Sequence, residues 1–161
     1  MILPKRFFVT VGRGTSTTSA LNAFDNALAA AGIDRCNLVP VSSILPTDAI
    51  QIPPVKIPAG TITFCVLSRY DGFGKEGAAG VGWTRGEIKK TRDRFGMVAE
   101  GSGKTTKDVE SELKNKLQEM AKSRSMTLQK DIQTAVTPTG KVPEKTFCSA
   151  IAAVIFVPEA D

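Results

Sequence analysis

Histidine is absent from this 161-residue sequence. Its absence excludes Ser-His-Asp triads, Cys-His pairs and zinc sites with histidine ligands. If the protein is an enzyme, carboxylates, lysine, tyrosine or a cofactor must carry out the acid–base chemistry. Cysteine is scarce too, because only Cys36, Cys65 and Cys148 occur, each in an apolar run and without metal-ligand spacing. We expect three reduced, buried cysteines that pack as small apolar residues, and no metal site.

Long hydrophobic runs are also missing. No apolar stretch approaches the ~18–20 residues that span a bilayer, and residues 1–8 lack the pattern of a secretory signal. We therefore expect a cytoplasmic protein without a membrane partner. The net charge of +5 comes largely from residues 89–94 and 104–130, where acidic residues are interleaved with the basic ones. This pattern favours a solvated surface over a nucleic-acid partner.

The length and the apolar fraction of 42% predict one domain over residues 1–161. Helical periodicity predicts helices at 21–31 and 106–124. The apolar face of the first contains Leu21, Phe24 and Leu28, and that of the second contains Val109, Leu113, Leu117 and Met120. Strands are predicted at residues 6–12, 36–43, 60–69, 81–85, 95–100, 128–136 and 147–157. Consecutive strands that outnumber the helices indicate an α+β fold with mostly antiparallel sheet.

The connecting segments are rich in glycine and proline. Residues 12–19 are predicted to be a loop, and the four prolines of 46–58 exclude a central strand or a helix. Residues 72–77 spell GxGxxG, but no helix is predicted after them, so a glycine-rich hairpin is favoured over a dinucleotide site. Residues 100–106 resemble the end of a phosphate-binding loop, yet Val98 stands where the first glycine is required. Neither motif predicts a nucleotide site.

Two adjacent serines, Ser42 and Ser43, end an apolar segment directly before the proline-rich region. Their surroundings, together with three further segments, resemble the pyruvoyl-dependent arginine decarboxylases over residues 6–157. The four segments are Asn-Leu-Val-Pro-Val-Ser-Ser-Ile-Leu-Pro at 37–46, Leu-Asn-Ala-Phe-Asp at 21–25, Lys-Ile-Pro-Ala-Gly at 56–60 and Met-Val-Ala-Glu-Gly-Ser-Gly-Lys at 97–104.

The resemblance implies a proenzyme that cuts its own backbone. The Ser43 hydroxyl would attack the carbonyl of Ser42, and elimination would then separate a β chain, residues 1–42, from an α chain, residues 43–161. Residue 43 would end as a covalent pyruvoyl group, which replaces pyridoxal phosphate and needs no metal. The ketone would form a Schiff base with L-arginine, and loss of carbon dioxide would give agmatine.

The resemblance also assigns roles to other residues. Glu100 would be the proton donor, with a pKa raised by burial beside apolar neighbours; alternatively it stabilises the start of the following helix. Asn37 would donate hydrogen bonds to the tetrahedral oxygen or to substrate. Asp25 would pair with the guanidinium through two parallel hydrogen bonds; its alternative is an exposed helix charge. Ser42 would end the β chain and contact the substrate.

For the whole molecule, the resemblance implies a four-layer αββα sandwich that assembles as a homotrimer of cleaved αβ protomers, with active sites between neighbours. The sequence departs from the family at residues 34–36 and at 70–94, a glycine- and charge-rich insertion. Two alternatives remain open at this point. One is a pyruvoyl decarboxylase of the same fold for another amino acid, such as histidine, and the other is an uncleaved binding or structural homologue.

Overall fold

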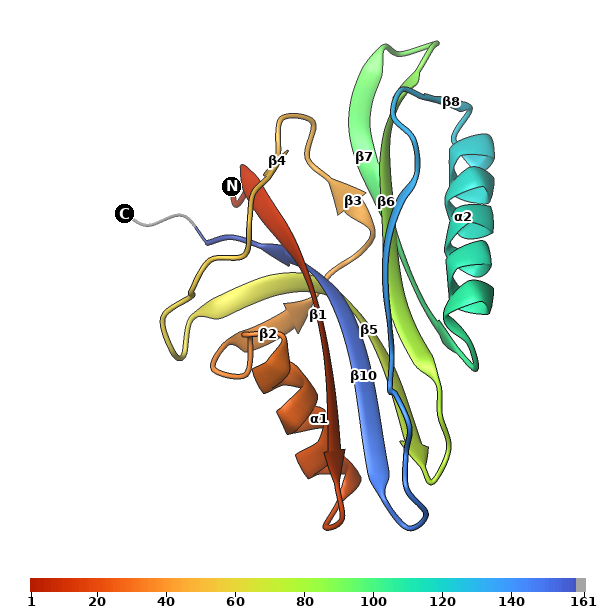
Figure 1. Cartoon of the computed structure of the whole chain (residues 1–161). Helices are drawn as coiled ribbons and strands as arrows, with labels where there is room; N and C mark the ends of the chain where they lie inside the picture. Colours follow the sequence, from red (N-terminus) through yellow and green to blue (C-terminus); the bar gives the residue numbers. More distant parts are fainter. Residues whose placement is uncertain (159–161) are drawn as a thin grey trace.

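The computed structural model describes residues 1–158, so the last three residues of the predicted domain lie outside the described part. The fold is α+β, with two helices and two mostly antiparallel sheets (Figure 1). The first sheet has the order β2 (Asn37–Pro40), β5 (Ile62–Phe73), β10 (Phe147–Phe156), β1 (Arg6–Ser16), β4 (Ile50–Gln51). The second has the order β3 (Ile44–Leu45), β7 (Asp93–Gly103), β6 (Ala78–Ile88), β8 (Met126–Leu128), and β9 (Gln133–Pro138) also pairs with β6.

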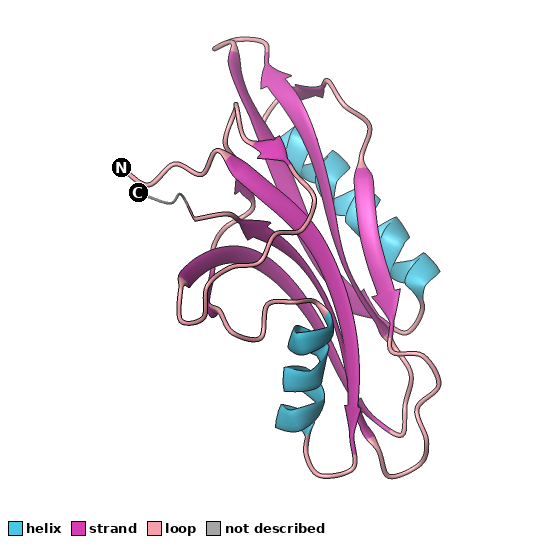
Figure 2. Cartoon of the chain, turned by 60° about the vertical axis from the view of Figure 1, so that its left-hand side comes forward, coloured by secondary structure: helices cyan, strands magenta, loops and turns pink. Residues whose placement is uncertain are grey.

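Each helix packs against a different sheet (Figure 1 and Figure 2). Helix α1 (Ala20–Ala30) lies along β1 and β10, whereas α2 (Thr106–Ser123) lies along β6 and β7. The buried apolar side chains form three clusters: one beneath α1, one with members from both sheets, and one beneath α2. Successive residues of β10 alternate between the first two clusters, since Ile151 belongs to one and Ala152 to the other. A strand buried on both faces explains the almost wholly apolar sequence of β10.

Helix α1 meets β1 at unusually close range. Its buried residues are Ala23 and Ala27, while Leu21 is 71% exposed, so the predicted position of Leu21 on the buried face is wrong. The close approach requires glycine on the strand. A Cβ at Gly14 would lie 2.5 Å from the carbonyl oxygen of Ala23 and 2.6 Å from the amide nitrogen of Ala27.

The same contact explains why residues 12–16 are strand rather than the predicted loop. Gly12 and Gly14 have little strand propensity, but they pair with Ile151 and Ser149 of β10 and are covered by α1. Tertiary packing therefore overrides the local composition.

Helix α2 is as the sequence predicts. Val109, Leu113 and Leu117 are fully buried, and Met120 is partly buried. The Thr105 side chain accepts a hydrogen bond from the Asp108 amide at the helix start. None of the helices in the described residues is long and apolar enough to cross a membrane.

Several predicted boundaries differ from the structure. The strand predicted at 36–43 ends at Pro40, because the chain then leaves the first sheet and joins the second at Ile44. Residues 70–94 contain the end of β5, all of β6 and the start of β7, so these strands extend beyond the predicted ranges 60–69, 81–85 and 95–100. Residues 72–77 join strands of different sheets, so the predicted hairpin is a turn between sheets. The strand predicted at 128–136 is divided between β8 and β9.

The contact between α1 and β1 can be tested by Gly14→Ala. The added methyl group must displace helix backbone, so we expect a loss of roughly 1–3 kcal/mol in the free energy of unfolding, measured by urea denaturation. Gly103→Ala is the matched control, because its Cβ would meet only the Val109 side chain at an ordinary 3.5 Å. Equal stability of the two variants would show that α1 can move away from β1 at no cost.

Candidate active site

The Ser42–Ser43 peptide lies where the chain crosses from one sheet to the other. On one side, the Val41 amide donates a 2.9 Å hydrogen bond to the Cys65 carbonyl of β5. On the other side, the Ser43 carbonyl accepts a 2.9 Å hydrogen bond from the Val98 amide of β7. Ser42 is exposed and Ser43 is half-buried. The peptide bond therefore joins two segments of the chain, one held by the first sheet and the other by the second sheet.

Ser43 and Glu100 line the same open pocket, which has a volume of about 430 Å³. This lies within the range of ~300–1,000 Å³ that is typical of small-molecule sites. The pocket lies between β7 and helix α2, and Ser43 forms part of its wall. Its lining residues are Ser43, Val98, Ala99, Glu100, Lys116, Glu119, Met120 and Ser123. The structure thus brings together two sequence-predicted site residues that are far apart in the chain.

The backbone at Glu100 is held from two directions. Lys116 of α2 donates a 2.8 Å hydrogen bond from Nζ to the Glu100 carbonyl, and Ser68 of β5 donates a 2.6 Å hydrogen bond from Oγ to the Gly101 carbonyl. Lys116 also forms a 2.6 Å ion pair with Glu112. These contacts fix the position of β7 at the pocket through residues that the sequence analysis did not identify.

The side chain of Glu100 is exposed in the single chain, so the expected burial beside apolar neighbours is not observed. The alternative role at the start of α2 is not observed either. Glu100 belongs to β7, and the first turn of α2 contains its own acidic residue, Asp108, and its own cap, Thr105.

Asn37 and Ser42 do not line the pocket of Ser43. Asn37 starts β2, and its Nδ2 donates a 2.8 Å hydrogen bond to the Gly60 carbonyl, the last residue of the 56–60 motif. Ser42 lines a separate cavity of about 320 Å³, mostly with apolar side chains such as Phe64 and Phe156. The two serines therefore belong to different cavities on the two sides of the crossing.

Asp25 lies farther away. It is exposed on α1. Helix α1 packs against the first sheet and α2 against the second (Figure 1), and the pocket of Ser43 and Glu100 lies beside α2. Within one chain, the structure does not bring Asp25 to the pocket.

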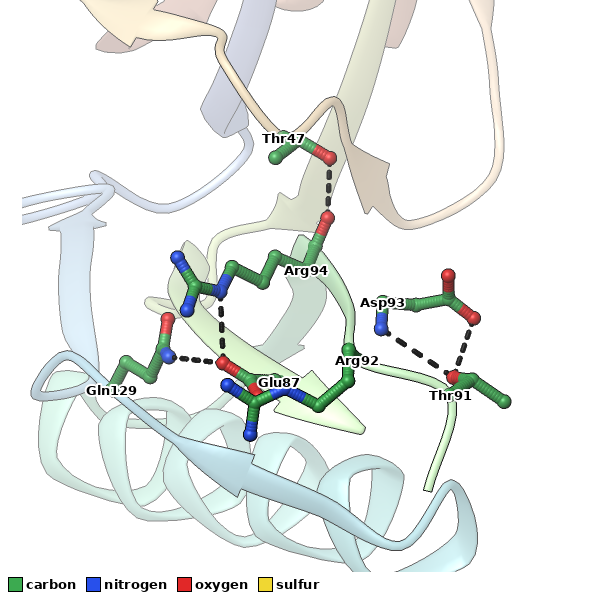
Figure 3. Close-up of polar contacts among 7 residues, drawn as sticks. All are labelled: Thr47, Glu87, Thr91, Arg92, Asp93, Arg94 and Gln129. Atoms are coloured by element: carbon green, nitrogen blue, oxygen red, sulfur yellow. Dashed lines mark hydrogen bonds and ion pairs between the residues drawn. The ribbon is translucent and has the colours of Figure 1, made fainter. Parts of the chain in front are cut away.

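A polar cluster that the sequence analysis missed supports the β6–β7 hairpin (Figure 3). Glu87 is only 7% exposed and accepts hydrogen bonds from Arg94 Nε at 2.8 Å and Gln129 Nε2 at 3.0 Å. Arg92 forms a 2.9 Å ion pair with the same carboxylate. The Arg94 hydrogen bond, with the charge of Arg92 added, lowers the pKa of Glu87 below its ordinary value. The signal for this cluster is the register of the hairpin, which sets Glu87 directly opposite Arg94.

The cysteines are placed as small packing residues. Cys65 and Cys148 are buried as predicted, and Cys36 is partly buried. Burial raises the pKa of the Cys65 thiol to about 11, which keeps it in its unreactive protonated form. Over residues 1–158, no group of three or more cysteine, aspartate and glutamate residues is arranged to hold a metal ion.

Comparison with known proteins gives the family. The profile described as "Pyruvoyl-dependent arginine decarboxylase" matches residues 6–161. Pyruvoyl-dependent arginine decarboxylase 2 of Archaeoglobus fulgidus is 36% identical, over 97% of this chain and 98% of the relative. The pyruvoyl-dependent arginine decarboxylases of Methanopyrus kandleri and Methanothermobacter thermautotrophicus are each 32% identical, over 97% and 98% of this chain and 99% of each relative. The resemblance predicted from four sequence segments is confirmed, and the chain belongs to the family of pyruvoyl-dependent arginine decarboxylases.

Proposed function

We propose that this protein is a self-processing carboxy-lyase that converts L-arginine to agmatine and carbon dioxide, using a pyruvoyl group made from Ser43. Family membership supports the reaction, and the shared pocket of Ser43 and Glu100 is the observation that supports the site. That pocket fits the group, because it is large enough for a small ligand and a half-buried serine opens into it.

Cleavage starts with the Ser43 hydroxyl oxygen, which attacks the carbonyl carbon of Ser42. The peptide C–N bond breaks, the nitrogen takes a proton, and an ester joins the two residues. Loss of the Cα proton of residue 43 and departure of the Ser42 carboxylate then leave dehydroalanine, and water replaces its nitrogen, which leaves as ammonia. The fixed flanks at Val41 and Val98 support this step, since a peptide held at both ends can be kept in a reactive conformation.

A pyruvoyl group at residue 43 would supply a ketone able to condense with the α-amine of arginine and to withdraw electrons while carbon dioxide leaves. Glu100 supplies the proton that replaces the carboxylate at the α-carbon. This role needs a protonated carboxyl group, and the pocket is open in the single chain. Cover by a neighbouring subunit would exclude water from the pocket.

The proposal therefore includes a homotrimer of cleaved αβ protomers. Large exposed apolar side chains line three pockets that share residues with one another, one of which contains Ser42: Ile2, Leu3, Val41, Ile44, Ile50 and Ile62. Exposed apolar side chains in such number are typical of an interaction surface. In the assembly, Asp25 of one chain reaches the site of its neighbour and binds the arginine guanidinium, with Asn37 and Ser42 as further substrate contacts.

Each protomer is proposed to be a four-layer αββα sandwich. The three apolar clusters support the order α1, first sheet, second sheet, α2, because the middle cluster contains residues of both sheets. The two fragments stay associated after cleavage, since β1 of the β chain lies between β10 and β4 of the α chain.

Intact-mass analysis under denaturing conditions tests the cleavage. The wild-type protein should give two fragments, residues 1–42 and a longer one blocked at residue 43, whereas Ser43→Ala should remain a single chain because it has no nucleophile. Ser42→Ala is the matched control and should still be cut, since only its carbonyl carbon takes part. A wild-type chain that stays intact after prolonged incubation would exclude self-processing and favour a non-enzymatic homologue.

Glu100→Gln separates processing from turnover. The variant should be cleaved normally but form agmatine roughly 10²- to 10⁴-fold more slowly, because the amide cannot donate the proton. The rate is measured as agmatine release from arginine. Glu110→Gln is the control and should behave as wild type, because Glu110 lies on the exposed side of α2, where it forms an ion pair with Lys114. Equal turnover by the Glu100 variant would remove this residue as the acid.

A site shared between subunits can be tested by complementation. Asp25→Asn alone should raise the arginine KM roughly 10- to 100-fold, since it weakens charged hydrogen bonds to the guanidinium, and Ser43→Ala alone should be inactive. At an arginine concentration far below the KM of Asp25→Asn, co-expression of the two variants should regain about a quarter of the wild-type activity, because random mixing completes that share of sites in a symmetric ring. Mixed assemblies without any regained activity would contradict the contribution of Asp25 from a neighbour.

A further inference from the structure

The turn that follows the cleavage site is bound by Arg85 of β6, a residue to which neither the sequence analysis nor the proposed mechanism gives a role. Its Nη1 donates hydrogen bonds to the carbonyl oxygens of Pro46 at 3.0 Å and Thr47 at 2.7 Å. Its Nη2 donates to the carbonyl oxygen of Ala49. One guanidinium therefore holds three backbone carbonyls of a single turn.

This use of an arginine is specific in its chemistry. Arg85 is half-buried, and within residues 1–158 no carboxylate forms an ion pair with it. The planar guanidinium offers several donors in fixed directions, which suits convergent carbonyl oxygens, whereas a lysine ammonium is a compact point charge on a flexible stem. The contacts of Arg85 thus orient backbone and do not neutralise an acidic group.

The same turn is fixed at a second point. The Thr47 hydroxyl donates a hydrogen bond to the Arg94 carbonyl of β7. The side chain of Arg94 is in turn held by the buried Glu87 carboxylate, which Gln129 also contacts (Figure 3). The turn is therefore attached to β6 through Arg85 and to β7 through Thr47.

Cleavage makes these attachments more important, because residue 43 becomes a chain terminus. Upstream of the turn, the new terminus keeps one hydrogen bond from Val98, the two-residue strand β3 and the buried side chain of Leu45. Chain termini are mobile unless they are tied down, and a two-residue strand is too short to do so alone.

We infer that Arg85 is a positioning residue for the reacting atoms at position 43, an inference that rests on the proposed function. By fixing the turn at 46–49, it holds the Ser43 hydroxyl against the Ser42 carbonyl before cleavage. After cleavage, it keeps residue 43 in the pocket that contains Glu100.

The test compares Arg85→Ala and Arg85→Lys with Arg92→Ala. Arg92 is the matched control, since it pairs with Glu87 on the same hairpin but contacts no carbonyl of the turn. Intact mass over time gives the processing rate, arginine turnover by the processed fraction gives kcat and KM, and thermal unfolding gives the midpoint.

We expect the Arg85→Ala chain to be cleaved roughly 100-fold more slowly, because a displacement of reacting atoms by about 1 Å can slow a reaction by that factor. Its kcat should fall while KM for arginine changes little, because no substrate contact is removed. Lysine at this position should not restore the rate, whereas millimolar guanidinium chloride should restore processing of Arg85→Ala and the same concentration of sodium chloride should not. Arg92→Ala should process at the wild-type rate.

Processing of Arg85→Ala at the wild-type rate would overturn the inference. So would slow processing that follows a lowered unfolding midpoint and is not rescued by guanidinium, because this pattern indicates a general stabilising role. If the wild-type chain is not processed at all, the proposed function fails. The hold of Arg85 on the turn at 46–49, called the clamp here, is then tested by itself in the Ser43→Ala chain. Hydrogen exchange at residues 44–50 should then be faster when Arg85→Ala is added, and unchanged exchange would refute the clamp.

Discussion

The chain between Val41 and Ile44 must join two sheets that are each held by their own hydrogen bonds. Val41 is bonded to β5 of the first sheet and Ser43 to β7 of the second, so the intervening peptide has little freedom to relax. A shift of the chain on either side of this peptide would break a hydrogen bond to a sheet, either that of Val41 to β5 or that of Ser43 to β7. The position of Ser43 in the pocket that Glu100 also lines depends on this crossing.

The surroundings of the crossing are arranged to keep it fixed. The second sheet is secured by α2, from which Lys116 reaches the Glu100 carbonyl, and Ser68 of the first sheet bonds to the adjacent carbonyl of Gly101. These contacts use backbone carbonyl groups as acceptors, and so do those of Arg85. The site is thus built by side chains that hold backbone, while the exposed carboxylate of Glu100 remains available to a ligand.

Sequence patterns predicted the elements whose burial follows a simple period. The stripe of α2 and the apolar run of β10 were correct because hydrophobic burial alone determines them. The predicted face of α1 was wrong at Leu21, whereas Phe24 and Leu28 do pack against the core. The most buried residues of the helix, Ala23 and Ala27, were missed because their close contact depends on glycine in β1, which leaves no hydrophobic signal. The roles of Ser43 and Glu100 came from family resemblance, since no local pattern predicts that they share a pocket. Arg85 was missed because contacts with backbone carbonyls leave no trace in the sequence.

Strand β1 lies between β10 and β4, two strands that follow residue 43 in the sequence, so a cut at that residue would decide whether folding involves one molecule or two. In one covalent chain, β1 reaches its place through an intramolecular search. After the proposed cleavage, the same strand would have to find its place from a separate molecule, which would make refolding dependent on concentration. The proposed mechanism therefore requires folding to precede cleavage, and it requires β1 to leave the cut protein slowly.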